Sequence, residues 1–391
     1  MIPWQFLAFT AIMGGLLYLH FYFAHSRWRR VRGANPSDID VNYVRREDYF
    51  AQSFRCKAKG WLELPSSNGN GTGERIITKG REHIRVSGPR QLGDREQSAD
   101  ILVIEGGFAC GAACQLLSEI YAYGEAEIGT GSRLQAIAAD QDLTLGDNVT
   151  VARWADSGGE LTMGQACVVR SRVTARKAVR LAVGAEALSF FAPEITSKSE
   201  PGPASVAADP VSEQILQIPP PEGHEDTAAW KKLGFDRERL SQLNSDCWIY
   251  QGSLRPLAPL RVSAQLIVKG DCVCPPGSVL EKDLKVADSL AVAEGSECRG
   301  NLVAGKWISV GPRVQLAGLL QAGGEILLSR GVRGAAQGAL VAAHAGSSLY
   351  LEGDVTWCGK LSAGDWVRVV PHAFAQNWRL KHQIQRESAR A

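Results

Sequence analysis

Short stretches of alternating apolar and polar residues, each ending in glycine, recur along most of the chain. In a first block, these stretches end at Gly106, Gly124, Gly146, Gly164 and Gly184. In a second block, they end at Gly252, Gly270, Gly295, Gly311, Gly331 and Gly353. Successive glycines lie about twenty residues apart, so we interpret the two blocks, residues 98–195 and 245–370, as tandem repeats of one small unit.

The length of this unit limits the possible architecture. A helix pair needs about 33 residues and a propeller blade about 40, and the register of leucine-rich repeats is absent. Period-2 alternation places Leu143 and Leu145 inside a coil and Thr144 outside. The pattern therefore predicts an all-β fold, a parallel β-helix in two repeat blocks. A β-sandwich of short antiparallel strands is the alternative.

The beginning of the chain has a different pattern. Residues 2–24 contain no Asp, Glu, Lys or Arg, and as a helix they would extend about 34 Å, enough to cross a bilayer core of about 30 Å. Arg27, Arg29, Arg30 and Arg32 follow, and the positive-inside rule places that side in the cytoplasm. We therefore predict an N-terminal transmembrane helix, with a short N-terminus outside and the bulk of the chain cytoplasmic.

The remaining segments complete the domain organisation. Residues 196–222 hold six of the seventeen prolines and are interpreted as a linker, followed by a helix over 226–243 that either caps the second block or lies on its surface. The predicted divisions are a transmembrane anchor at 1–25, a partly ordered juxtamembrane region at 26–97, the first block at 98–195, a Pro-rich linker and short helix at 196–244, the second block at 245–370 and a basic tail at 371–391.

Three segments of the second block carry a family resemblance. They are Val279–Val286 (VLEKDLKV), Glu294–Ala304 (EGSECRGNLVA) and Gly311–Gly318 (GPRVQLAG). Their cadence resembles the G-D/N-L-x-V and E-G-A-x-V-x-G-N-V-x-A pattern of bactofilins, which are polymer-forming bacterial cytoskeletal proteins. The resemblance covers about residues 245–370 and, more loosely, 98–195.

The resemblance implies a right-handed β-helix that polymerises head-to-tail without nucleotide and positions cell-envelope machinery. We therefore expect a membrane-anchored cytoskeletal scaffold at the bacterial inner membrane. Its expected partners are further copies of itself, the membrane through residues 2–24, and cell-envelope or morphogenesis proteins. Unpaired strand edges at a β-helix end could pair with the next molecule and form filaments. A non-polymerising membrane adaptor is an alternative, since the first block or the predicted helix could cap the second.

An enzyme is the other alternative. Ile128–Arg133 and Leu145–Thr150 fit the unit of hexapeptide-repeat acyltransferases, although such units do not follow one another every six residues. His344 is the candidate general base in either block, and it would need a partner and a cleft. No nucleophile elbow or phosphate-binding loop occurs. We therefore predict a protein that is not an enzyme, with no catalytic residue and no cofactor.

Composition and charge exclude further classes. With 45% hydrophobic residues the chain is not disordered, and a net charge of +2 gives no sign of nucleic-acid binding, which usually needs a basic face or domain. The nine cysteines have no framework spacing, which indicates reduced thiols. Cys110 with Cys114, and Cys272 with Cys274, lack a second pair or a nearby His, so we predict no metal site.

Overall fold

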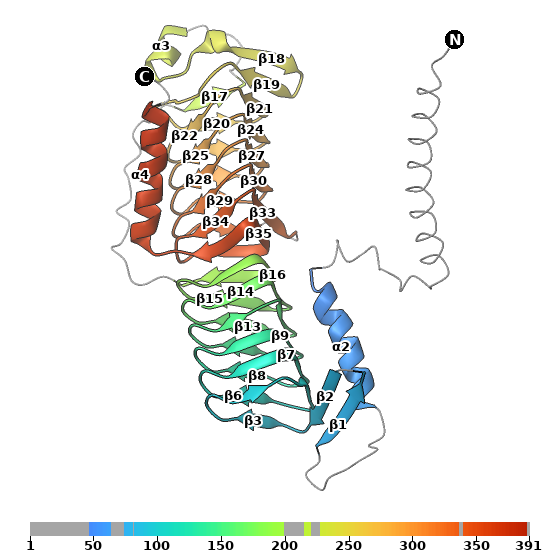
Figure 1. Cartoon of the computed structure of the whole chain (residues 1–391). Coiled ribbons are helices and arrows are strands. Elements are labelled where there is room, and N and C mark those ends of the chain that lie inside the picture. Colours follow the sequence, from blue (N-terminus) through green and yellow to red (C-terminus); the bar gives the residue numbers. More distant parts are fainter. Residues whose placement is uncertain are drawn as a thin grey trace, which may run out of the picture. The chain divides into compact units, whose positions relative to one another are not determined.

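A computed structural model describes residues 47–63, 74–80, 82–198, 215–219, 227–335 and 339–388. Most of these residues form a parallel β-helix of about 14 coils, wound in the right-handed sense, in two blocks (Figure 1). The β-helical part of the predicted fold class is therefore confirmed.

The transmembrane helix in the predicted fold class has to be corrected. No helix within the described ranges is long and apolar enough to cross a membrane. The segment for which that helix was predicted, residues 2–24, lies outside the described residues. Within the described residues the fold is thus a β-helix with no membrane-spanning helix, and the predicted location as a single-pass inner-membrane protein is corrected in the same way, since these residues give it no support.

The first block is built from an outer helix, α2 (Tyr49–Leu62), and sixteen strands. The strands are β1 (Arg75–Lys79), β2 (Glu82–Ser87), β3 (Arg90–Leu92), β4 (Gln97–Ser98), β5 (Ile101–Ile104), β6 (Phe108–Cys110), β7 (Gln115–Ala122), β8 (Ala126–Ile128), β9 (Arg133–Ala139), β10 (Leu143–Leu145), β11 (Thr150–Val151), β12 (Ala155–Ser157), β13 (Glu160–Met163), β14 (Val168–Ala175), β15 (Ala178–Leu181) and β16 (Glu186–Ser197).

The second block has three helical pieces, α3 (Thr227–Lys232), η2 (Arg237–Arg239) and α4 (His372–Ser388). Its strands are β17 (Leu216–Ile218), β18 (Leu240–Asn244), β19 (Cys247–Tyr250), β20 (Leu260–Val262), β21 (Gln265–Val268), β22 (Cys272–Cys274), β23 (Val279–Leu280), β24 (Leu284–Val286), β25 (Leu290–Val292), β26 (Glu297–Cys298), β27 (Leu302–Ala304), β28 (Ile308–Val310), β29 (Gln315–Leu316), β30 (Leu320–Ala322), β31 (Ile326–Leu328), β32 (Arg333–Gly334), β33 (Val341–Ala345), β34 (Ser348–Leu351) and β35 (Thr356–Val369).

Each coil has three short strands that pair in parallel with the same strands of the next coil. The true repeat is 18 residues, because Leu266, Leu284, Leu302 and Leu320 stand in one ladder. The glycine spacing of about twenty residues combined glycines from different corners. The predicted alternation is confirmed, since Leu143 and Leu145 are buried and Thr144 is exposed.

One corner of each coil in the first block has a positive φ. This position is held by Arg95, Ala113, Gly131, Asn148, Ala166 and Gly184, with φ between 51° and 78°. Asp or Asn side chains support other corners: the Asp283 carboxylate accepts the Asn301 N–H at 2.8 Å, and the Asn301 side chain accepts the Leu319 N–H at 2.8 Å. Corners are therefore held or supported by several residue types, of which glycine is only one.

The two blocks meet at their C-terminal coils. β16 pairs antiparallel with β35 along all three sides of the coil, from Glu186 opposite Arg368 to Thr196 opposite Thr356. Phe190 and Leu361 face each other in this junction, and a single apolar core includes buried residues of both blocks. The direction in which successive coils follow one another consequently reverses at the junction.

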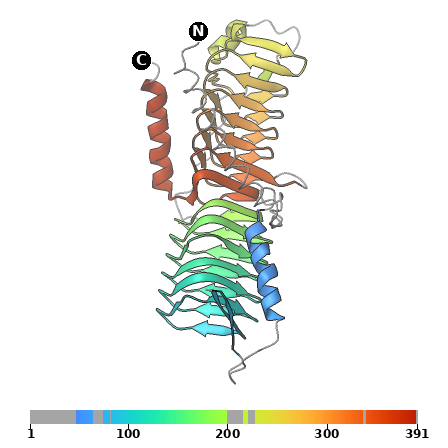
Figure 2. The same ribbon diagram turned by 45° about the vertical axis from the view of Figure 1, so that its right-hand side comes forward.

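An outer helix covers one side of each block (Figure 2). α2 packs on the first block through Phe54 and Ala58, against Val103 and Tyr121. α4 packs on the second block through Ala375 and Trp378, against Leu327.

The structure adds detail to three predicted segments. The predicted basic tail, residues 371–391, contains α4. The region 26–97, predicted to be partly ordered, contributes α2 and the first strands. The helix expected over 226–243 spans only Thr227–Lys232, because Gly234 adopts a φ of +74° that ends it.

Candidate functional site

Because apolar ladders fill the coils, the groups available for function lie on coil ends, outer faces and grooves. The C-terminal coil ends of the two blocks meet each other at the junction. Gly184 donates its N–H to the Val369 carbonyl at 2.9 Å, and Val369 donates to the Ala185 carbonyl at 3.0 Å. The Arg368 guanidinium pairs with the Glu186 carboxylate across the blocks. These contacts occupy the C-terminal ends of both blocks.

An apolar cap covers the N-terminal end of the second block. Phe235 is fully buried there, with its ring centroid 5.1 Å from that of Trp230 and 5.5 Å from that of Tyr250. Burial raises the pKa of the Tyr250 phenol, which remains neutral and accepts the Asp236 N–H at 3.3 Å. Of the two roles considered for the segment after the linker, the structure therefore supports the cap.

A cluster of charges lies at the N-terminal end of the first block. Arg85 Nε donates to Asp100 Oδ2 at 2.8 Å, and Glu74 accepts from Arg90 at 2.7 Å and from Arg85 at 3.1 Å. Burial acts to raise the pKa of Glu74, but hydrogen bonds from Arg90 and Arg85 outweigh it and the pKa lies below its ordinary value. Charged side chains at a sheet end hinder pairing with another chain.

Buried ion pairs fix α2 on the first block. Arg55, 3% exposed, donates to Asp140 at 2.8 Å and pairs with the Asp156 carboxylate. The Tyr121 hydroxyl donates to Asp140 at 2.8 Å, and Lys59 lies 3.0 Å from the same carboxylate. Burial acts to raise the pKa of Asp140, yet the hydrogen bonds from Lys59, Tyr121 and Arg55 bring it below its ordinary value. These ion pairs and hydrogen bonds attach α2 to the coils, and we call this cluster of Arg55, Lys59, Tyr121, Asp140 and Asp156 the α2 clasp.

A second clasp fixes α4 on the other block. Trp378 Nε1 donates to Glu325 at 2.7 Å, and His382 stacks on the Trp378 ring with centroids 3.9 Å apart. Glu352, 3% exposed, pairs with both His372 and Arg379. The fold thus uses charged and aromatic side chains of both helices for attachment.

The candidate base of the acyltransferase alternative is isolated. His344 lies exposed on β33, and its Nδ1 is 3.1 Å from the Ser362 hydroxyl. The grooves described below do not include it. Within the described residues, His344 therefore has no hydrogen bond to a carboxylate, and it lines none of the three grooves.

The cysteines form no cluster with metal-binding geometry in the described part of the chain, and none of the nine forms a disulfide. Burial raises the pKa of Cys110 to about 11 and that of Cys167 to about 12. Such thiols remain protonated near neutral pH and serve as small apolar side chains of the ladders.

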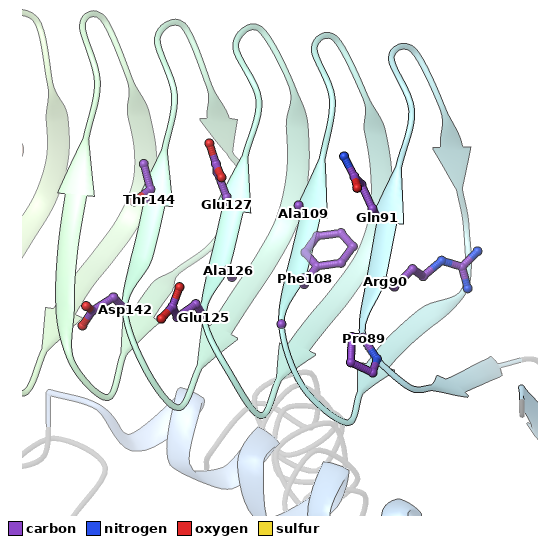
Figure 3. Close-up of a pocket in the computed structure, with 11 residues that line it drawn as sticks. Pro89, Arg90, Gln91, Phe108, Ala109, Glu125, Ala126, Glu127, Asp142 and Thr144 are labelled. Atoms are coloured by element: carbon purple, nitrogen blue, oxygen red, sulfur yellow. The ribbon is translucent and has the colours of Figure 1, made fainter.

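A shallow groove of about 490 Å³ crosses the first four coils of the first block (Figure 3). Its wall carries an outward row of Gln91, Ala109, Glu127 and Thr144, and Glu125 and Asp142 lie at the neighbouring turn. Asp142 already accepts the Glu160 N–H at 2.7 Å. The lining contains no histidine, serine or cysteine, and its polar groups are those of Arg90, Gln91, Thr144 and three carboxylates.

A smaller groove of about 380 Å³ lies beside the junction, lined by both blocks. Trp366 is 44% exposed there, and Leu188 is 37% exposed. The Arg368 guanidinium lies 5.7 Å from the centroid of the Trp366 ring and holds one side of it.

Comparison with known proteins adds no functional assignment. No family model, no curated protein and no solved structure matches the chain. The bactofilin resemblance of residues 245–370 therefore stays a prediction. The β-helix is compatible with a bactofilin and with a hexapeptide-repeat acyltransferase.

Proposed function

We propose that this protein is a non-catalytic β-helical scaffold that acts as a discrete adaptor and does not form filaments. The observation that carries the proposal is the β16–β35 pairing, since it uses the C-terminal ends of both blocks inside one molecule. A head-to-tail polymer needs two free complementary ends on every subunit.

The other two coil ends support the same proposal. Phe235 and its aromatic neighbours cover the N-terminal end of the second block, and the cluster of Glu74, Arg85, Arg90 and Asp100 places charges at that of the first, beside β1. Apolar caps and charged side chains at a sheet end are two ways in which β-proteins avoid end-to-end association.

The bactofilin resemblance suggests the same general class, a structural protein without nucleotide chemistry. The difference lies in assembly, because bactofilins polymerise. A filament of this chain would have to open the junction or displace a cap.

Sedimentation and negative-stain electron microscopy of the purified full chain, at micromolar concentration and without nucleotide, test the proposal. We expect discrete particles of 42.2 kDa. Phe235→Asp should expose the end of the second block and promote association, whereas Leu243→Asp, at a residue 60% exposed, should leave the particles unchanged. Filaments of the unmodified protein would overturn the proposal and favour the head-to-tail scaffold.

A further inference from the structure

β1 has a free edge. Its five residues pair antiparallel with β2, from Arg75 opposite Val86 to Lys79 opposite Glu82, and no described residue pairs with its other side. Lys79 and Glu82 flank a two-residue turn and therefore form a hydrogen-bonded pair. Because bonding alternates along an antiparallel strand, Ile76 and Thr78 direct their N–H and C=O groups away from β2.

Apolar side chains beside this edge are incompletely covered. Ile76 is 57% exposed on one side of the strand. On the other side, Ile77 is half-buried with Trp61 and Leu62 at the margin of the cluster under α2. A groove of about 330 Å³, lined in part by Trp61, Ile101 and Lys79, lies at the end of β1. Alternate side chains of an added strand would bury this margin.

The charges select among the possible occupants. Arg75 pairs with Glu105 at 2.9 Å, while Lys79 has no carboxylate partner in the described ranges. In a twofold pairing of β1 with a second copy, centred on Ile77, Arg75 of each copy would lie opposite Lys79 of the other. Like charges directly opposite one another destabilise a strand pair. A partner strand with an acidic residue opposite Lys79 would instead place opposite charges together.

We infer that the free edge of β1 binds an extended segment of a partner protein, which adds to the sheet as a further strand and carries an acidic residue beside aliphatic ones. Backbone hydrogen bonds to Ile76 and Thr78 would supply the affinity, and Lys79 with the apolar margin the specificity. This inference rests on the proposed adaptor function and names its partner surface.

Fluorescence anisotropy with a labelled peptide, Glu-Val-Thr-Val-Glu-Val-Thr, tests the inference on the full chain. The same peptide with lysine in place of glutamate is the control probe. Thr78→Pro removes one outward N–H without touching the bonds to β2, so peptide affinity should fall about tenfold or more. Thr78→Val keeps that N–H and should bind as the unmodified protein does. Lys79→Glu should reverse the preference between the two peptides.

Amide hydrogen exchange adds a direct measurement. The acidic peptide should slow exchange at Ile76 and Thr78 at least about tenfold, and slow it little at Arg75 and Ile77, which already bond to β2. If Thr78→Pro does not fold, as judged by its melting curve, Ile76→Pro replaces it.

Three results would overturn the inference. The first two are equal binding of both peptides and unchanged binding by the proline variant. Concentration-dependent dimers that Thr78→Pro abolishes would also overturn it and assign the edge to a second copy. These outcomes differ from failure of the proposed function, because filaments would be seen without any peptide.

Discussion

The indole of Trp357 fills the space that a side chain at Gly334 would occupy. A Cβ atom on Gly334 would lie 2.2 Å from Trp357 Cε3, and Trp357 is fully buried one coil further along the same ladder. Trp357 Nε1 also donates to the Val341 carbonyl at 3.0 Å. One glycine thereby allows the largest buried side chain to enter the coil next to the junction.

Gly334→Ala should therefore destabilise the protein. Overpacking of this kind costs about 1–3 kcal/mol in the free energy of unfolding. Urea titration followed by tryptophan fluorescence measures the change. Gly88→Ala is the matched control, since an added Cβ there meets nothing within 4 Å. A stable Gly334→Ala protein would contradict the packing described for Trp357.

The corner with positive φ predicts substitutions of opposite sign. Ala113, with a φ of 59°, pays for a conformation that glycine adopts freely, so Ala113→Gly should stabilise by about 0.5–1 kcal/mol. Gly131→Ala, one coil later, should destabilise by a similar amount, because an added Cβ meets nothing within 4 Å and only backbone strain changes. Thermal unfolding measures both. Ala109→Gly, within β6, is the control and should be destabilising.

The clasp under α2 predicts a large effect of one arginine. Arg55→Ala leaves the carboxylates of Asp140 and Asp156 without their main partner, which costs about 3–5 kcal/mol for a buried pair. Lys57→Ala, on the exposed side of the same helix, should change the free energy of unfolding by less than about 0.5 kcal/mol. Equal effects of the two variants in urea titrations would argue against the buried clasp.

The attachment of α4 predicts a dependence of stability on acid. The hydrogen bond from His382, followed by that from Trp378, holds the pKa of Glu325 below its ordinary value despite the opposing effect of burial. Because the pKa of Glu325 is lower in the folded than in the unfolded protein, its ionised carboxylate stabilises the folded state at pH values above the unfolded pKa of about 4.3. This stabilisation is lost as the pH falls through the folded pKa.

Glu325→Gln should thus be less stable than the unmodified protein by about 1–2 kcal/mol at pH 7, and the difference should shrink towards pH 3. Urea titrations at each pH measure it. Glu281→Gln, in the exposed pair with Arg261, should give a difference below about 1 kcal/mol at every pH. A Glu325→Gln difference that stays constant down to pH 3 would contradict this linkage.

Thiol reactivity offers a check on the ladders. Cys56 is exposed on α2, whereas Cys110 and Cys167 are buried with raised pKa values. A thiol-reactive dye at pH 8 should label Cys56 first, and the buried cysteines only after denaturation. Cys56→Ser should remove the fast phase and leave only slower labelling of the half-buried Cys358. Labelling of more than these two thiols before denaturation would contradict the burial of the ladder cysteines.

The sequence predicts the coils better than their ends. Period-2 alternation at Leu143 and Leu145 is local and directly gives the inward ladders. The repeat length was less accessible, because Arg95, Ala113 and Asn148 hold corner positions where glycine was expected. Nothing local indicates that β16 pairs with β35, since this contact depends on how two distant coils meet.

The sequence only partly indicates the two outer helices, α2 and α4. Ala375, Trp378 and His382 recur at helical spacing within the predicted basic tail, and these are the buried positions of α4. Phe54 and Ala58 give a similar signal in α2, although the buried Arg55 between them reads as a surface residue until Asp140 and Asp156 are placed beside it.

The closing of one block by the other sets a delay during synthesis. β16 ends at Ser197, but its partner begins only at Thr356, about 160 residues later. At about 5–20 residues per second, the ribosome needs roughly 8–30 s to supply that partner. During this interval the finished first block presents an open rim of hydrogen-bonding groups. Neighbouring nascent chains on the same messenger RNA could therefore pair with each other through this edge of β16. The interval is also long enough for a chaperone to bind the edge.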